Sequence, residues 1–229
     1  MKWISDLLDI IFPRHCLVCG DILAKDEKDI CLSCLVGMPL IDNEQRNEIE
    51  KIFWGIVEIE RAASYMYYRK GSPYNKLLHS MKYDNHPEIG YRLATNIAKE
   101  LMEENFFSEI DLIIPLPLSN KKKKRRGYNQ CDYIAKGISQ VTNIEVLTDS
   151  IERTIANETQ THKNRQERWK NVEGIFTVTN VEKITGKHIL LVDDILTTGA
   201  TIASCAKSMV EAGCKVSILT IAYSNNKFQ

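Results

Sequence analysis

Apolar and polar stretches alternate along most of this chain. Within the apolar stretches, the apolar residues recur with the spacing of a strand in some places and with the spacing of a helix in others. Alternating or continuous apolar residues predict strands over 62–68, 111–118, 144–148, 174–178, 189–192 and 215–222. Helical spacing predicts helices over 75–81, 91–102, 130–140 and 201–212. Repeated strand–helix units favour a parallel sheet with right-handed crossovers and helices on both faces. The expected fold class is therefore α/β.

The first twelve residues carry one apolar stripe at helical spacing, formed by Trp3, Ile4, Leu7, Leu8 and Ile11. We expect this stripe to pack on its own domain, with a partner protein or peripheral membrane contact as the alternatives. Asp6 and Asp9 interrupt the apolar run and no small-residue cleavage site follows, so a secretory signal is not indicated. No stretch approaches the roughly 20 apolar residues of a transmembrane segment. Secretion is therefore not expected.

The length of 229 residues accommodates one ordinary domain and a small module. We place the module at 1–50 and the main domain at 51–229, with polar residues 40–60 as the connector. The formal net charge is zero, so any contact with nucleic acid requires a local basic patch.

Four cysteines near the start form two Cys-x-x-Cys pairs, Cys16 with Cys19 and Cys31 with Cys34. Each pair can bind one metal ion through both sulfurs, and two pairs complete a closed tetrahedral zinc site of structural type. A segment of about 40 residues buries too little apolar surface to fold alone, so zinc would supply stability. Redox-active dithiols are the alternative, but no thioredoxin-like strand–helix context surrounds either pair.

Three further cysteines, Cys131, Cys205 and Cys214, lie singly in or beside predicted helices and strands. Small thiols in such positions commonly pack in the core, and we expect that role for all three.

The most informative segment runs from Ile189 to Thr201. An apolar strand leads into Asp193 and Asp194, which we place at its carboxyl end, and a small, hydroxyl-rich loop then enters a helix. Backbone N–H groups of such a loop, with the helix dipole behind them, can hold a phosphate. Two carboxylates at the same strand end can accept hydrogen bonds from vicinal sugar hydroxyls. An ordinary strand–turn–helix junction is the alternative.

Six consecutive cations, Lys121 to Arg126, follow the strand at 111–118. If the strands are parallel, this basic loop lies on the same sheet edge as the acids, where it could contact pyrophosphate or a nucleic-acid backbone. A solvated loop without a ligand is the alternative. The long polar segment 152–171 is interpreted as a mobile lid.

The segment 189–201 closely resembles the signature of type I phosphoribosyltransferases, which bind phosphoribosyl pyrophosphate (PRPP). Nearly the whole chain resembles the ComF family, in which a zinc ribbon precedes a domain of that type, and this resemblance implies a cytoplasmic protein. The residues that carry this resemblance are Phe12–Pro13 with the first cysteine pair, 78–83, 115–119, 126–130, Arg153 with Thr159–Gln160, Glu167–Arg168 with Asn171, and 189–201. The lysine run departs from the family pattern, so the resemblance does not assign individual pyrophosphate contacts.

The resemblance implies roles for particular residues. Asp193 and Asp194 would hold the ribose hydroxyls and act at the reacting centre, with Mg²⁺ on the leaving pyrophosphate. The 5′-phosphate would lie in the loop of Thr197, Thr198, Gly199, Ala200 and Thr201. The residues expected to contact pyrophosphate or nucleic acid are Lys124, Arg125, Arg126, Arg153 and Arg168.

Three functions fit these features. The first is a ComF-like PRPP-binding protein that handles single-stranded DNA during uptake in natural transformation. The second is a phosphoribosyltransferase acting on a small base, and the third is a non-catalytic PRPP sensor that docks a partner. The sequence contains no Gly-rich dinucleotide fingerprint or P-loop, so ATP-driven movement of DNA would require a separate helicase or translocase.

Overall fold

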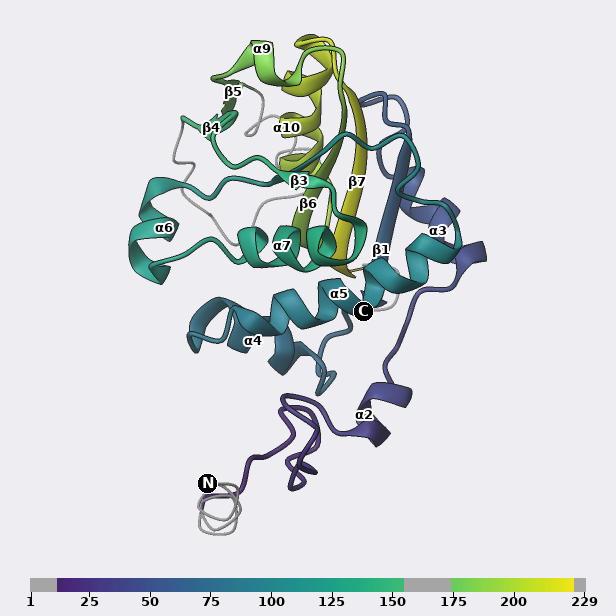
Figure 1. Cartoon of the computed structure of the whole chain (residues 1–229), viewed down its shortest axis with the longest axis vertical. Coiled ribbons are helices and arrows are strands. Elements are labelled where there is room, and N and C mark those ends of the chain that lie inside the picture. Colours follow the sequence, from purple (N-terminus) through teal and green to yellow (C-terminus); the bar gives the residue numbers. More distant parts are fainter. Residues whose placement is uncertain (1–11, 155–173, 225–229) are drawn as a thin grey trace.

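A computed structural model describes residues 12–154 and 174–224 of the chain (Figure 1). Its centre is a five-stranded sheet in the order β1-β7-β6-β2-β3, and every neighbouring pair is parallel. The strands are β1 (Arg61–Tyr67), β2 (Leu112–Pro115), β3 (Glu145–Val146), β6 (His188–Leu196) and β7 (Lys215–Tyr223). The predicted α/β class, with a parallel core, is confirmed.

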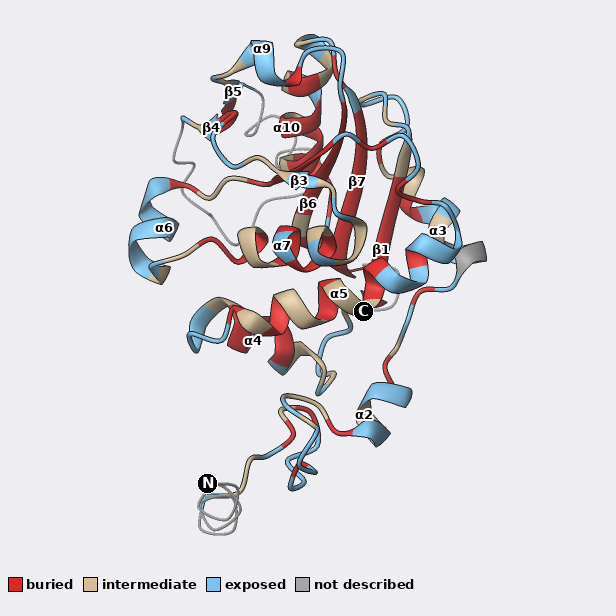
Figure 2. Cartoon of the chain, in the orientation of Figure 1, coloured by how far each residue is buried: buried red, intermediate tan, exposed pale blue. Residues whose placement is uncertain are grey.

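Helices cover both faces of this sheet. One face packs against α4 (Asn75–Tyr83), α5 (Glu88–Glu103) and α7 (Gln130–Thr142), and the other against α3 (Asn43–Glu50) and α10 (Ala200–Glu211). Alternate residues of β6 supply the two cores: Leu190 and Val192 join the first, and Ile189 and Leu191 join the second. The central strands are buried along most of their length (Figure 2). Burial on both faces explains why these strands are continuously apolar in sequence.

The strand predicted at 174–178 does not join the parallel sheet. It forms β5 (Phe176–Val178), which pairs antiparallel with β4 (Ile151–Arg153), a strand that the sequence did not predict. The short helix α9 (Val181–Ile184) follows it. Apolar periodicity identifies a strand but not the strand it pairs with, which is why the prediction was wrong.

The segment predicted as a polar connector contains helix α3. The Asp42 side chain accepts a hydrogen bond from the Gln45 backbone N–H at 3.0 Å, so it caps the helix. Ile49 and Phe53 are buried in the second core. Because only a few residues of this segment are buried, its composition is mostly polar and did not predict a helix.

The predicted basic loop is also helical. Helix α6 (Asn120–Arg126) begins at Ser119, whose hydroxyl accepts a hydrogen bond from the Lys122 backbone N–H. It ends at Gly127, where φ is 82°, a conformation that glycine adopts without strain. These two caps define a helix in a segment whose charge alone indicated an open loop.

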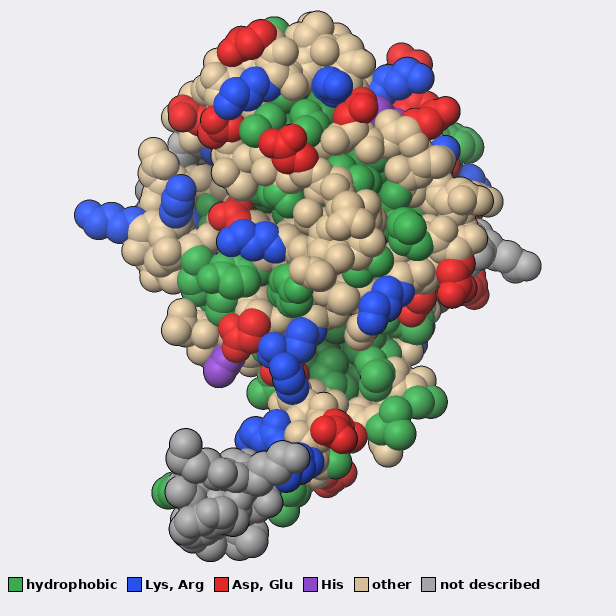
Figure 3. Space-filling view, viewed as in Figure 1, with side chains coloured by type: hydrophobic (Ala, Val, Ile, Leu, Met, Phe, Trp, Pro, Cys, Tyr) green, Lys and Arg blue, Asp and Glu red, His purple; other side chains and the backbone are tan. Residues whose placement is uncertain are grey.

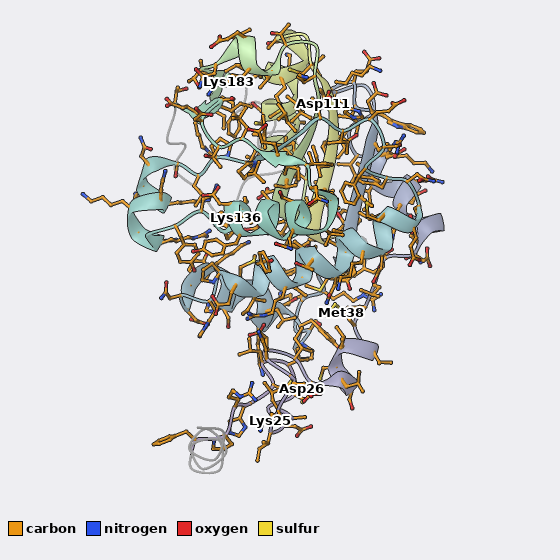
Figure 4. The ribbon with its side chains drawn as sticks, viewed as in Figure 1. Lys25, Asp26, Met38, Asp111, Lys136 and Lys183 are labelled. Atoms are coloured by element: carbon orange, nitrogen blue, oxygen red, sulfur yellow. The ribbon has the colours of Figure 1, made fainter. Side chains whose placement is uncertain are left out.

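The N-terminal module contacts the main domain through α4 and α5 (Figure 1). It contains the short helix α2 (Leu32–Val36). The Tyr74 hydroxyl donates to the Cys34 carbonyl at 2.8 Å, and Lys76 Nζ donates to the Val18 carbonyl at 3.4 Å. Met38 is buried where the two parts meet (Figure 4). The module therefore shares one continuous apolar core with the main domain.

Candidate functional site

The acid pair lies inside β6, because the strand continues to Leu196 and does not end at Val192 as the sequence suggested. Asp193 is paired with Thr220 of β7, and Asp194 is 4% exposed. Successive side chains leave a strand on opposite sides, so two adjacent carboxylates contact different partners. Their partners come from elements far away in the sequence.

Asp194 is compensated by α4 and α7. Lys82 Nζ lies 2.8 Å from its Oδ1, and Gln130 Nε2 donates to its Oδ2 at 2.5 Å. Burial by itself lowers the pKa of Lys82, but the charge of Asp194 and the hydrogen bond to it outweigh burial and raise that pKa. Lys82 is therefore held as a cation beside a buried carboxylate.

Asp193 has weaker compensation. The Cys131 thiol donates to Asp193 Oδ1 at 3.3 Å, and the Asp194 backbone N–H donates to the same oxygen at 2.8 Å. Burial, followed by the charge of Asp194, raises the pKa of Asp193 to about 7. Asp193 therefore releases its proton at a much higher pH than an ordinary aspartate.

Three further cations converge on this acid pair. Burial lowers the pKa of Lys122, and the charges of Arg153, Arg126 and Lys82 lower it further. The Arg126 and Arg153 side chains each have a buried Nε without a hydrogen-bond partner among the described residues. Neighbouring cations that lower the pKa of Lys122, together with buried guanidinium donors that have no partner among the described residues, favour an anion placed among them. The arrangement is suited to a phosphate-rich ligand.

Helix α6 divides the basic run into two faces. Lys122 and Arg126, four residues apart, are partly buried, and Arg126 donates to Gln130 Oε1 at 2.6 Å. The remaining cations, Lys121, Lys123, Lys124 and Arg125, are exposed. Lysine and arginine side chains project from this edge of the molecule (Figure 3). Of the three predicted contact residues in the run, only Arg126 is partly buried beside the acid pair.

The loop after β6 leads into α10 through Gly199, where φ is 79°. A Cβ added at Gly199 would lie 2.9 Å from Ile52 Cγ2, so both the backbone conformation and the space require glycine. Thr198 and Ala200 are buried, whereas Thr197 is exposed. The first turn of α10 has no acidic residue and no side-chain cap, which leaves its N-terminal N–H groups suited to an anion.

The structure adds two residues that the sequence did not assign to the site, Lys82 and Gln130. It also places Lys122, a member of the predicted basic run, among the cations near the acid pair. Lys82 and Gln130 lie in two of the segments that carry the family resemblance, but no local pattern indicates that they meet Asp194. Cys131 packs in the core as predicted and also contacts Asp193. Arg168 and most of the segment interpreted as a lid lie outside the described residues.

The four N-terminal cysteines come together as the spacing predicted. The sulfurs of Cys16, Cys19, Cys31 and Cys34 all lie within 4.8 Å of one another, and those of Cys19 and Cys31 are 3.7 Å apart. Zinc–sulfur bonds of about 2.3 Å give a tetrahedron with edges of about 3.8 Å, so the cluster fits zinc.

The Cys16 thiol has a lowered pKa. Burial raises the pKa of its thiol, but hydrogen bonds from backbone groups, first those of Cys19 and Cys31, outweigh burial and lower the pKa to about 6. The thiolate, which is the form that binds metal, is therefore favoured at neutral pH.

Comparison with known families identifies both parts of the chain. A family described as "Phosphoribosyl transferase domain" matches residues 82–227, and one described as "Double zinc ribbon domain" matches residues 7–46. The first match spans most of the chain, and the chain therefore belongs to the phosphoribosyl transferase domain family. The four-cysteine module is a zinc ribbon.

Similarity to individual proteins narrows this assignment. DNA utilization protein YhgH of Shigella flexneri is 28% identical over 144 residues, covering 62% of this chain and 63% of that protein. Competence protein F of Haemophilus influenzae is 27% identical over 145 residues, with the same coverage. Competence protein ComFC of Bacillus subtilis is 31% identical over 107 residues, covering 47% of this chain and 41% of that protein. These relatives confirm the ComF family that the sequence resembles.

The match spans less than two thirds of the length of these relatives. Among solved structures, adenine phosphoribosyltransferase from Saccharomyces cerevisiae is similar with a TM-score of 0.40 and 14% identity, covering 62% of this chain and 72% of that one.

In the described part of the chain, no helix has the length and apolar character needed to cross a membrane.

Replacing Cys31 with Ser is expected to reduce the zinc content of the purified protein, because the site loses one of four thiolates. Since the ribbon contacts α4, amide hydrogen exchange in α4 should also accelerate. Elemental analysis and exchange mass spectrometry measure the two effects. Cys214→Ser, a change at a buried thiol outside the cluster, is the control and should keep its zinc. Full zinc content in Cys31→Ser would contradict the assignment.

The raised pKa of Asp193 predicts a pH dependence of stability. A carboxyl with a pKa near 3.8 in the unfolded chain and about 7 in the fold stabilises the fold below pH 4 and loses this contribution as pH rises through 7. The unfolding free energy of the unliganded protein, relative to Asp193→Asn, should therefore fall between pH 5 and pH 8, by on the order of 2 kcal/mol. Denaturant unfolding at several pH values measures it, and parallel curves for the two proteins would disprove the shift.

Proposed function

We propose that this protein binds PRPP at the carboxyl edge of its parallel sheet and handles single-stranded DNA in the cytoplasm. The observation that carries the proposal is the convergence of four cations and the α10 N-terminus around the acid pair, in which Asp194 is buried and Asp193 partly buried. Ligands of open α/β sheets bind at this edge. A sugar with phosphates on both sides has the hydroxyls and the anionic groups that this arrangement accommodates.

In this proposal each part of the ligand has its own residues. Asp193 and Asp194 accept hydrogen bonds from the ribose hydroxyls, and the N–H groups of 197–201 hold the 5′-phosphate. Lys122, Arg126 and Arg153 face the pyrophosphate, and Lys82 moves from Asp194 toward it. The oxygens of PRPP and of the acid pair suit Mg²⁺, which would neutralise the leaving pyrophosphate. The chain itself contributes positioning and electrostatic stabilisation.

The DNA part of the proposal is supported by the family and by the exposed face of α6. The relatives are named for competence and DNA utilization. Exposed Lys121, Lys123, Lys124 and Arg125 can neutralise backbone phosphates. Because the sequence has no P-loop, we propose that a separate helicase or translocase drives DNA movement.

Two other functions use the same acid pair: a phosphoribosyltransferase acting on a small base, and a sensor that binds PRPP without reaction. Pyrophosphate release from PRPP and Mg²⁺ distinguishes them when measured alone, with bases and with single-stranded DNA. Release that depends on a base supports the transferase. PRPP binding without release, together with DNA binding, supports the DNA-handling protein, whereas PRPP binding without DNA binding supports the sensor.

Asp193→Asn and Asp194→Asn are each expected to weaken PRPP binding, because each removes a charged hydrogen-bond acceptor for a ribose hydroxyl. The loss should be about 1.5 to 3 kcal/mol per residue, measured by titration calorimetry with Mg²⁺ present. Asp149→Asn changes an exposed acid that pairs with Lys183 and should bind PRPP normally. Unchanged affinity in the Asp193/Asp194 double variant would exclude the assignment.

Neutralising the exposed face of α6 with Lys121→Gln, Lys123→Gln and Lys124→Gln is expected to weaken single-stranded DNA binding. Each lost phosphate contact should reduce the slope of log affinity against log salt by about 0.7. Fluorescence anisotropy over a salt series measures this slope. The control changes Lys183, Lys187 and Lys215, exposed residues beside the N-terminal ends of β6 and β7, to Gln. Equal slopes in the two triple variants would show that α6 does not contact DNA.

A further inference from the structure

An exposed tyrosine lies beside the acid pair at the last residue of α4. Tyr83 is 52% exposed. The buried residues of the same helix are Leu77, Leu78, Ser80 and Met81. The adjacent residue, Lys82, is the one that contacts Asp194. A large aromatic side chain left in solvent at this position is not explained by core packing.

Charged and aromatic groups surround this ring. The Arg126 guanidinium lies 5.0 Å from the Tyr83 ring centroid, and that of Arg125 lies 5.7 Å from it. The ring centroids of His79 and Tyr83 are 5.0 Å apart and the two rings are tilted relative to each other. Asp84 Oδ2 lies 3.3 Å from His79 Nδ1. Arg126 also donates to the Tyr83 hydroxyl at 3.4 Å. The ring is thus fixed in position while half of the residue remains accessible.

The same residues connect the ring to the acid pair. Arg126 donates to Gln130, and Gln130 donates to Asp194, so one hydrogen-bonded series runs from Tyr83 to the carboxylate. On the other side, the exposed cations of α6 continue from Arg125 along the helix. An aromatic ring followed by a row of cations is the combination that binds single-stranded nucleic acid, since bases stack and phosphates pair with the cations.

We propose that Tyr83, together with Arg125, Arg126 and His79, forms a stacking platform for one unpaired base of single-stranded DNA. The backbone of that strand follows the exposed face of α6. This inference rests on the proposed DNA-handling function and assigns its base contact. A paired base in a duplex has both faces covered by its neighbours, so the platform selects single strands. It also brings a nucleotide next to the acid pair.

The test compares two oligonucleotides of equal length, oligothymidylate and a strand made only of abasic deoxyribose phosphates. Both carry the same phosphates, so the ratio of their affinities isolates stacking. We expect the protein to bind oligothymidylate about tenfold more tightly, and Tyr83→Ala to remove most of that ratio while keeping the salt slope. Tyr83→Phe should retain the ratio, because the ring face is preserved.

Trp54→Ala is the matched control. Like Tyr83, Trp54 is an exposed aromatic residue, 67% exposed, with a cation near its ring: Lys51 Nζ lies 5.9 Å from the ring centroid. Unlike Tyr83, it follows α3 and does not share the hydrogen-bonded series that connects Tyr83 to the acid pair. PRPP calorimetry on Tyr83→Ala checks that the acid pair is intact. If the unaltered protein binds both strands equally, the platform is wrong while DNA handling stands. If it binds neither strand, both are wrong. An unchanged ratio in Tyr83→Ala also overturns the platform.

Discussion

Two adjacent carboxylates inside a buried strand are the constraint on which the rest of this structure depends. Without partners, Asp193 and Asp194 would repel each other in a medium that solvates neither. Lys82 and Gln130 satisfy Asp194, whereas Asp193 receives only a thiol and a backbone N–H and has a raised pKa. The negative charge of Asp194 is balanced by Lys82, whereas no cation among the described residues balances a negative charge on Asp193 as closely. In the proposed function, the carboxylate oxygens of this pair accept hydrogen bonds from the ribose hydroxyls of the ligand.

The position of α4 links the zinc ribbon to this site. Its first turn binds the ribbon through Tyr74 and Lys76, and its last turn presents Lys82 and Tyr83. Arg92 of α5 makes an ion pair with Asp29 of the ribbon, which adds a second attachment. A ribbon stabilised by zinc thus helps to hold the helix that supplies the main cation of the acid pair. These contacts connect the metal module physically to the acid pair of the main domain.

Helix α6 shows how one charge-rich segment can have two roles. Residues four apart lie on the same side of a helix, so Lys122 and Arg126 are directed to the acid pair while the residues between them stay in solvent. The inner pair is partly desolvated and therefore suited to a small, highly charged anion. The outer cations remain hydrated and are suited to a long, weakly held polyanion. A loop would have given all six residues the same exposure.

The sequence by itself determined the features that depend on local pattern: the strand–helix alternation, the four-cysteine cluster and the hydroxyl-rich loop that leads into α10. Each follows from spacing or from the backbone preferences of a few neighbouring residues. Only the tertiary structure decided that Lys82 and Gln130 meet Asp194, that β5 pairs with β4, and that the lysine run is a helix with two faces. The first two features depend on how distant elements pack, and contacts between distant segments leave no periodic signal in either segment. The helix of the lysine run begins and ends at local caps, but which of its side chains are buried depends on its neighbours. The acid pair and the loop before α10 could therefore be recognised from the sequence, whereas the electrostatic balance around the pair could not.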